Sequence, residues 1–216
     1  NDPELGNSAY NIPHRIQASA YYHVQYGARK QWQTTVGVIY TAKSGSPYTL
    51  YTYGDMNGDG ASGNDLLYIP TSDQLNSMQF EETSFNNNAL TRRLFGPGTD
   101  AWSANGNAYP KTLTAAMQRQ LMETWIDGDS YLSKHRGEFF KRYADNLAFE
   151  QHFDLHFGQK YSFKVLGDVN SIELTVDIIN VGNLLNKDWG HTYGDGVGVY
   201  YSPVTYRGYG VYQFTG

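Results

Sequence analysis

Strict two-residue alternation runs through residues 15–26 of the chain. The even positions carry Ile16, Ala18, Ala20, Tyr22, Val24 and Tyr26, and the odd positions carry Arg15, Gln17, Ser19, Tyr21, His23 and Gln25. Successive side chains of a β-strand point to opposite faces, whereas a helix would bring the two classes together on every side. The pattern therefore predicts a β-strand with one apolar face and one polar face.

The same alternation recurs in three further segments, 31–42, 147–158 and 171–180. Short turn-forming stretches join the first segment to the second and the third to the fourth, which is typical of β-hairpins. We therefore predict one hairpin over 14–42 and another over 147–182. We expect the four strands to pair in sequence order as one antiparallel sheet.

The two hairpins are separated by residues 43–146, which carry no sustained alternation and which we expect to form one long extracellular loop. One short amphipathic helix is predicted inside it, over 112–127, because apolar residues recur there at every fourth position and Gly128 ends the run. Those residues are Leu113, Met117, Leu121 and Trp125. Residues 183–216 are expected to form a Gly- and Tyr-rich loop, in which 204–214 pairs as a further hairpin strand.

A connection of roughly 100 residues is unusual within a compact soluble domain. It is typical of outer-membrane barrels, which have short turns on one side and long loops on the other. The predicted fold class is therefore mainly β: antiparallel strands of a transmembrane β-barrel, with too few strands to close alone, since small barrels use ~8. A soluble antiparallel sheet with one solvated face stays open as the alternative, because periodicity does not separate lipid-facing from core-facing residues.

Three stretches carry a resemblance to a known family. They read FEQHFDLHFGQ at 149–159, LTVDIINVGNLLNK at 174–187, and GDMNGDG through NDLLYIP at 54–70. Together they resemble the C-terminal barrel region of TonB-dependent outer-membrane receptors, of the Oar-like and SusC-like kind found in Bacteroidetes. Residues 131–137 resemble a loop of the Oar type.

This resemblance implies a 22-stranded barrel with an N-terminal plug, located in the outer membrane of a Gram-negative cell and importing a nutrient. The chain would be a near-C-terminal slice without the plug, the TonB-binding segment or the last strand. The implied partners are outer-membrane lipid, the rest of the barrel and plug, and the TonB system through the missing N-terminal part; a surface lipoprotein is also compatible. Nucleic acid is not expected, because the net charge of −5 is spread along the chain.

A candidate calcium site lies in the loop after residue 54. Asp55, Asn57 and Asp59 alternate and are followed by Gly60, which matches the first half of a calcium-binding loop. The twelfth position is a leucine, and Asp65 lies one residue before it. Two interpretations stay open: a Ca²⁺ site formed by these four oxygen-bearing side chains, or a turn rich in Gly, Asn and Asp.

One strand face carries Glu150, His152, Asp154 and His156. Alternate strand residues lie ~6.6 Å apart, which is wide for several ligands of one zinc ion, so we interpret this face as the polar lining of a lumen.

The chain has no Cys, and no phosphate-binding glycine loop or nucleophile elbow is present. We therefore expect a protein that is not an enzyme. A metal-dependent hydrolase using His152, Asp154 and His156 is the weakest hypothesis.

Tyrosines in the last loop are the candidate substrate-facing residues. They are Tyr193, Tyr200, Tyr206 and Tyr209. Their rings could stack on a substrate or could stiffen the loop, and the sequence leaves both interpretations open.

The predicted function is that of a transporter segment contributing barrel wall and substrate-facing loops. The alternative is a soluble β-rich module that binds a glycan or peptide, with a calcium site.

Overall fold

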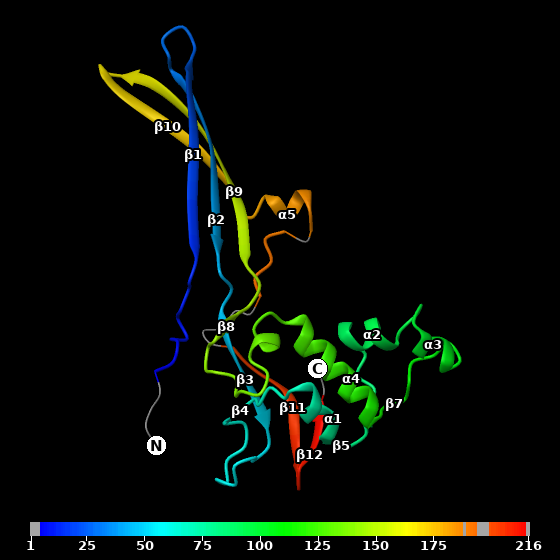
Figure 1. Cartoon of the computed structure of the whole chain (residues 1–216). Coiled ribbons are helices and arrows are strands. Elements are labelled where there is room, and N and C mark those ends of the chain that lie inside the picture. The colour runs from blue at the N-terminus through cyan, green and yellow to red at the C-terminus, as the bar shows by residue number, and fades with distance from the viewer. Residues whose placement is uncertain (1–4, 188, 194–198, 215–216) are drawn as a thin grey trace. The chain divides into compact units, whose positions relative to one another are not determined.

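The structure is a computed structural model that describes residues 5–187, 189–193 and 199–214. The chain divides into two compact units, each of which is described separately. The sheet unit comprises residues 10–47 and 146–197, and the mixed unit comprises residues 1–9, 48–145 and 198–216. Figure 1 labels most of the helices and strands of both units.

Four long strands make up the sheet unit. They are β1 (Arg15–Tyr26), β2 (Trp32–Lys43), β9 (Glu150–Val165) and β10 (Asp168–Ile178). All neighbouring pairs are antiparallel, in the order β1-β2-β9-β10. This order confirms the pairing predicted from the alternation. A short helix, α5 (Gly182–Leu185), follows the last strand.

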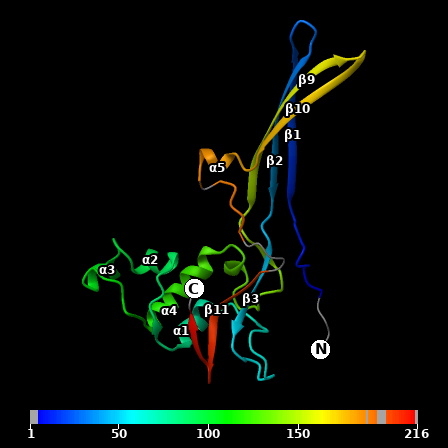
Figure 2. The same ribbon diagram turned by 180° about the vertical axis from the view of Figure 1, so that it is seen from behind.

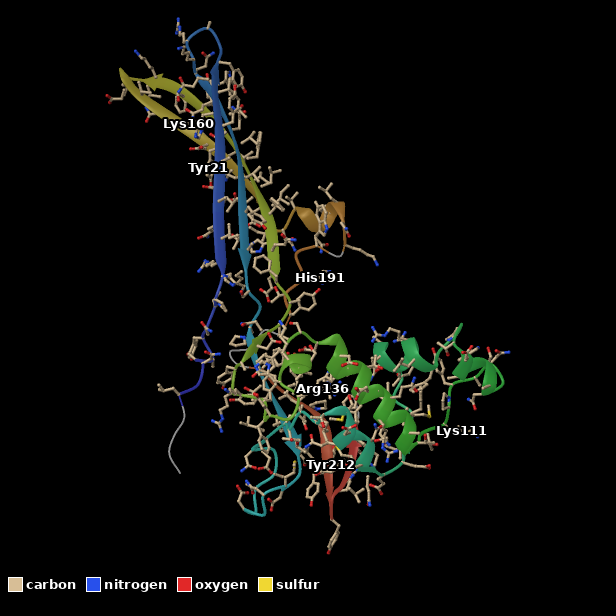
Figure 3. The ribbon with its side chains drawn as sticks, viewed as in Figure 1. Tyr21, Lys111, Arg136, Lys160, His191 and Tyr212 are labelled. Atoms are coloured by element: carbon tan, nitrogen blue, oxygen red, sulfur yellow. The ribbon has the colours of Figure 1, made fainter. Side chains whose placement is uncertain are left out.

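The register of the sheet gathers the apolar side chains on one face. Tyr22 pairs with Val36, Val36 pairs with Phe157, and Phe157 pairs with Val176. The side chains of this row are all between 40% and 70% exposed. Side chains project from both faces of the sheet (Figure 3). This row of the apolar face is therefore not covered by the described part of the chain.

The mixed unit contains a second sheet, whose strands are ordered β4-β3-β11-β12-β5. The strands are β3 (Pro47–Tyr53), β4 (Asp65–Leu66), β5 (Gln79–Phe80), β11 (Val199–Gly208) and β12 (Val211–Phe214), with β8 (Asp145–Asn146) at the passage between the units. A separate pair is formed by β6 (Thr83–Ser84) and β7 (Thr112–Leu113). This sheet is mixed, because β11 runs parallel to β3 and β12 parallel to β5.

The mixed unit also contains helices (Figure 2). They are α1 (Ser72–Ser77), α2 (Ala89–Phe95), α3 (Asp100–Ala104), α4 (Ala115–Gly128) and the 3-10 helix η1 (Leu132–Lys134). One of them, α4, packs against β5 and β12 of this sheet. The four α-helices each begin after a Thr or Asn whose side chain accepts a backbone N–H of the first turn. The core is apolar and includes Leu67, Ile69, Leu75, Leu121, Ile126, Phe140 and Phe214.

The helix predicted over 112–127 is confirmed as α4 with shifted bounds, because Thr112 and Leu113 form β7 and Gly128 lies within the helix. The expectation of one helix within a long loop was too simple. Residues 43–146 supply most of the mixed unit, including α1, α2 and α3. Each of these helices has seven or fewer residues, too short to display an apolar period in the sequence. The expected loop 183–216 contains β11 and β12, which confirms the hairpin over 204–214.

No sheet formed by the described residues closes into a barrel. Among the same residues, no helix combines the length and the apolar character needed to cross a membrane.

Candidate functional site

The predicted calcium loop follows β3 and is closed by hydrogen bonds to Asp55. One carboxylate oxygen of Asp55 accepts the backbone N–H groups of Gly58 at 2.7 Å and Asp59 at 3.1 Å. The other oxygen accepts the N–H of Gly60 at 3.0 Å. Asp55 therefore fixes the turn by itself, as an Asx-type turn residue does.

Asp59 has a second set of hydrogen bonds in the same loop. Its carboxylate accepts the backbone N–H of Ala61 at 2.8 Å and the side-chain amides of Asn57 at 3.1 Å and Asn64 at 2.9 Å. These three hydrogen bonds stabilise the ionised form and lower the pKa of Asp59 below its ordinary value. Asp65 reaches back to the start of the loop and accepts the N–H of Met56 at 2.7 Å.

The loop geometry supports the turn interpretation without deciding the calcium one. Each carboxylate oxygen offers two lone pairs, so an oxygen that accepts a backbone N–H can still bind a hard cation. Within the described ranges, however, no group of three or more His, Asp or Glu side chains is arranged to hold a metal ion. Calcium binding by Asp55, Asn57, Asp59 and Asp65 stays a prediction.

On the polar face of the sheet unit, the acidic and histidine side chains have partners along the whole face. Glu150 forms an ion pair with Lys43 at 3.2 Å, and His156 Nδ1 lies 2.6 Å from a carboxylate oxygen of Asp177. Asp154 accepts the backbone N–H of Asn180 at 2.8 Å. His152 lies 3.8 Å from Asp154. Glu150, His156 and the pair of His152 and Asp154 thus make separate contacts, and a polar lining of a lumen stays a prediction.

The four candidate tyrosines do not form one site. Tyr193 lies in the sheet unit, where its backbone N–H donates to Glu150 at 3.2 Å. In the mixed unit, Tyr200 is hydrogen-bonded to the hydroxyl of Tyr143. Tyr206 packs against Tyr212 with ring centroids 5.4 Å apart. Tyr209 is fully exposed at the turn between β11 and β12. The geometry of Tyr200 and Tyr206 favours stiffening of the fold over a shared substrate surface.

The stretch VDIINVGNLLNK, which carries the family resemblance, forms the end of β10 and α5. Asn180 adopts the left-handed backbone conformation with φ of 56°, and its side-chain amide donates to the carbonyl of Gly190 at 3.1 Å. Asn183 donates to the carbonyls of Lys187 at 3.4 Å and Trp189 at 3.0 Å. The asparagines of the motif therefore hold the chain where it leaves the strand.

Sequence reasoning missed an apolar cavity in the mixed unit. Three methionines line it, Met56, Met78 and Met122, together with side chains from six other segments of the unit. No sequence signal could have found it, because these methionines are separated by at least 22 residues along the chain and come together only through the fold.

Comparisons with protein-family models, with curated proteins and with solved structures gave no match for this chain.

Proposed function

We propose that the chain is part of a TonB-dependent outer-membrane transporter. The sheet unit contributes a section of barrel wall, and the mixed unit contributes extracellular, substrate-facing structure. The transporter assignment rests on the family resemblance of residues 54–70, 149–159 and 174–187. The membrane assignment rests on the sheet itself, and the role is structural and transport-related, without catalysis.

One observation carries the membrane proposal: in the middle of β2, residues of the polar face are buried and residues of the apolar face are exposed. In β2, Val36 and Val38 on the apolar face are 40% and 41% exposed, whereas Thr35, which precedes Val36 on the polar face, is 7% exposed. Gly37, which lies between the two valines, is also buried. A soluble sheet has the opposite distribution, with apolar residues inward and polar residues outward. An apolar outer face and a polar inner face are the pattern of a membrane barrel.

The spacing of aromatic pairs along the sheet fits a bilayer. Trp32 contacts Tyr161 with ring centroids 4.4 Å apart, and Tyr40 contacts Phe153 at 4.7 Å. Trp32 and Tyr40 are eight residues apart in β2, which corresponds to ~27 Å along a strand at ~3.4 Å per residue. Outer-membrane barrels have aromatic girdles on both sides of an apolar band ≈25 Å tall.

The connections of the four strands also agree with this topology. The turns 27–31 and 166–167 lie at the same end of the sheet, because Tyr26 pairs with Trp32, which pairs with Tyr161. Residues 44–149, the connection between β2 and β9, leave from the opposite end. Among the described strands β1 and β10 each have one neighbour in this sheet, so each would pair with a further strand of a complete barrel.

A soluble β-rich module that binds a glycan or peptide is the second candidate. It is favoured by the mixed unit, whose buried side chains form a core of their own. The two candidates differ in how the chain behaves without detergent. A barrel segment needs lipid to cover its apolar face, whereas a soluble module stays monomeric in buffer.

Vesicle flotation tests the proposal. The chain, refolded with phosphatidylethanolamine and phosphatidylglycerol vesicles, is expected to float with lipid after an alkaline carbonate wash. A chain that stays monomeric in detergent-free buffer and remains at the bottom of the gradient would contradict the membrane assignment and favour the soluble module.

A further inference from the structure

The mixed unit contains a half-open cavity of about 260 Å³. Its walls come from β3 and the loop after it, from α1, from α4 and from β11 and β12. Three of the four methionines of the chain line it, Met56, Met78 and Met122. Thioether side chains are polarisable and flexible, so they adapt to the shape of an apolar ligand.

Aromatic rings form the rest of the apolar lining. Phe139 is 57% exposed and packs edge-to-face on Tyr68 with ring centroids 5.1 Å apart. Tyr212 contributes a third ring (Figure 3). Within the described part of the chain no charged side chain lines the cavity. Apolar and aromatic walls without a charge favour a neutral ligand, because a buried charge would have no partner.

Few polar groups remain for a ligand to pair with. Gln74 and Tyr68 satisfy each other, with Gln74 Nε2 donating to the Tyr68 hydroxyl at 3.0 Å. The hydroxyl of Tyr212 makes no hydrogen bond with another described residue, and burial raises its pKa, so it is a neutral phenol at pH 7. Tyr212, a residue of the cavity lining, therefore keeps a hydroxyl that can pair with a polar substituent of the ligand.

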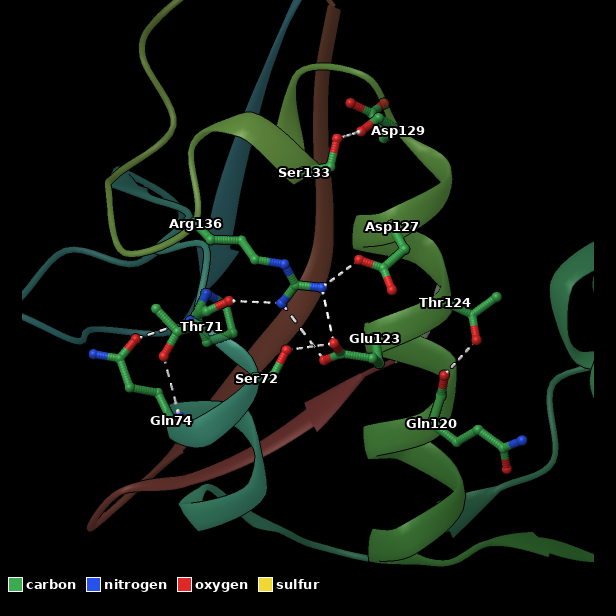
Figure 4. Close-up of polar contacts among 11 residues, drawn as sticks. Thr71, Ser72, Gln74, Gln120, Glu123, Thr124, Asp127, Asp129, Ser133 and Arg136 are labelled. Atoms are coloured by element: carbon green, nitrogen blue, oxygen red, sulfur yellow. Dashed lines mark hydrogen bonds and ion pairs between the residues drawn. The ribbon is translucent and has the colours of Figure 1, made fainter.

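The walls of the cavity are held in place by Arg136 (Figure 4). Its guanidinium donates at 3.1 Å to the carbonyl of Pro70, which is a residue of the cavity wall. The guanidinium also donates to two carboxylates of α4, Glu123 at 3.0 Å and Asp127 at 2.7 Å. Glu123 directly follows Met122, another residue of the cavity wall. This network ties the segment before α1 to α4. A ligand would consequently meet a largely preformed pocket.

The volume sets the size of the ligand. An apolar protein cavity of ~150 Å³ is large enough to bind benzene. We propose that this cavity is a binding site for a neutral aromatic small molecule, with one substituted or fused ring and a single N–H or O–H group. The site goes beyond the proposed transport function and does not depend on it.

Methionine methyl NMR tests the site directly, with indole as the probe. In the full chain labelled with ¹³C-methyl methionine, indole is expected to shift the signals of Met56, Met78 and Met122 saturably. Met117, on α4 but outside the cavity lining, is the internal control and should not move. Absence of saturable shifts, or equal shifts at all four methionines, would overturn the proposal.

Two variants locate the binding. Ser77→Phe places a ring in the cavity from the exposed end of α1 and is expected to weaken indole binding at least about tenfold. Phe139→Ala removes an exposed wall and is expected to weaken it about threefold. Phe149→Ala, which removes a comparably exposed ring in the sheet unit, is the matched control and should bind as the parent does.

Both variant positions are exposed, so the fold should be retained, and an unchanged Met117 signal verifies this. If Ser77→Phe fails to fold, Phe139→Ala decides the question. Binding of indole to both variants with parental affinity would contradict the assignment. The measurement reads the mixed unit alone, so its result is independent of whether the sheet unit enters a membrane.

Discussion

Val36 in β2 lies directly opposite Phe157 in β9, and each side chain is 40% exposed. The preceding pair, Thr35 with Gly158, faces the other side of the sheet, where Thr35 is only 7% exposed. Exposing apolar side chains at the centre of a sheet to water is unfavourable in free energy, because the hydrophobic effect favours their burial. The proposed contact of this face with lipid would account for its exposure.

A charge on the apolar face should oppose membrane insertion. We expect Val36→Arg to lower the unfolding free energy in lipid vesicles by ~2–4 kcal/mol, the cost of an arginine at the lipid face near the bilayer midplane. Guanidinium unfolding of vesicle-bound protein measures the change. Thr175→Arg, at an exposed position on the polar face, is the control and should have little effect. Equal losses in the two variants would argue against lipid contact.

Calcium should stabilise the loop that begins at Asp55 if the oxygen-rich half-motif binds it. The melting temperature of the parent chain is then expected to rise with Ca²⁺ and to fall again with EDTA. In Asp55→Asn the response should disappear, because one anionic ligand is lost. Identical melting of the parent in Ca²⁺ and in EDTA would remove the calcium site and leave the turn interpretation.

The same loop should respond to acid through Asp59. Its pKa is lowered from the ordinary value of 3.8 by hydrogen bonds from Ala61, Asn57 and Asn64. A lowered pKa means that the stabilisation is complete above the unfolded-state value and is lost as the pH falls through the folded-state value. The amide signal of Ala61 should therefore titrate with its midpoint below pH 3.8. Asp59→Asn, which cannot ionise, should abolish this titration, and a titration that persists would assign it to another group.

Arg136 should stabilise the mixed unit, since its side chain is 16% exposed and is ion-paired with Glu123 and Asp127. We expect Arg136→Ala to cost ~1–2 kcal/mol in urea unfolding, with the exposure of Asp127 keeping the figure modest. Arg136→Lys should recover less than half, because an ammonium group cannot form the same fork. Arg93→Ala, an exposed control, should be nearly neutral; a similar loss there would point to a general charge effect.

Asn180 should be sensitive to its backbone conformation. Its φ of 56° is strained for most residues with a side chain. Asn180→Ala is expected to cost ~2 kcal/mol, because it keeps the strain and loses the hydrogen bond to Gly190. Asn180→Gly relieves the strain and should cost ~1 kcal/mol or less. Thermal unfolding ranks the variants, and the reverse order would show that the backbone is not the cause.

The sheet unit was predictable because its signal is local and repeated. Alternation over residues 15–26 and its recurrence set the strand positions, and short turns set their pairing. The mixed unit was not predictable in this way. Its strands β4 and β5 have two residues each, and β11 pairs with β3 across about 150 residues of sequence. Such contacts have no periodic pattern that a single sequence displays.

The candidate sites differ in the same way: a site made of adjacent residues was predictable from the sequence, and a site assembled by the fold was not. The loop at Asp55 was recognisable because its residues are adjacent and their turn chemistry is local. The cavity was not, because Met78 and Met122 approach only when α1 and α4 pack. The tyrosines were chosen by composition, and the fold distributes Tyr193 and Tyr200 to different units.

A pair of single-cysteine variants tests the central proposal most directly, since the chain contains no native Cys. Val176→Cys and Thr175→Cys are adjacent in β10, are both exposed, and face opposite sides of the sheet. Each would be labelled with a small environment-sensitive fluorophore after refolding into vesicles. We predict a blue-shifted, lipid-quenched probe at 176 and a water-accessible probe at 175. The same aqueous emission at both positions would contradict the barrel-wall assignment.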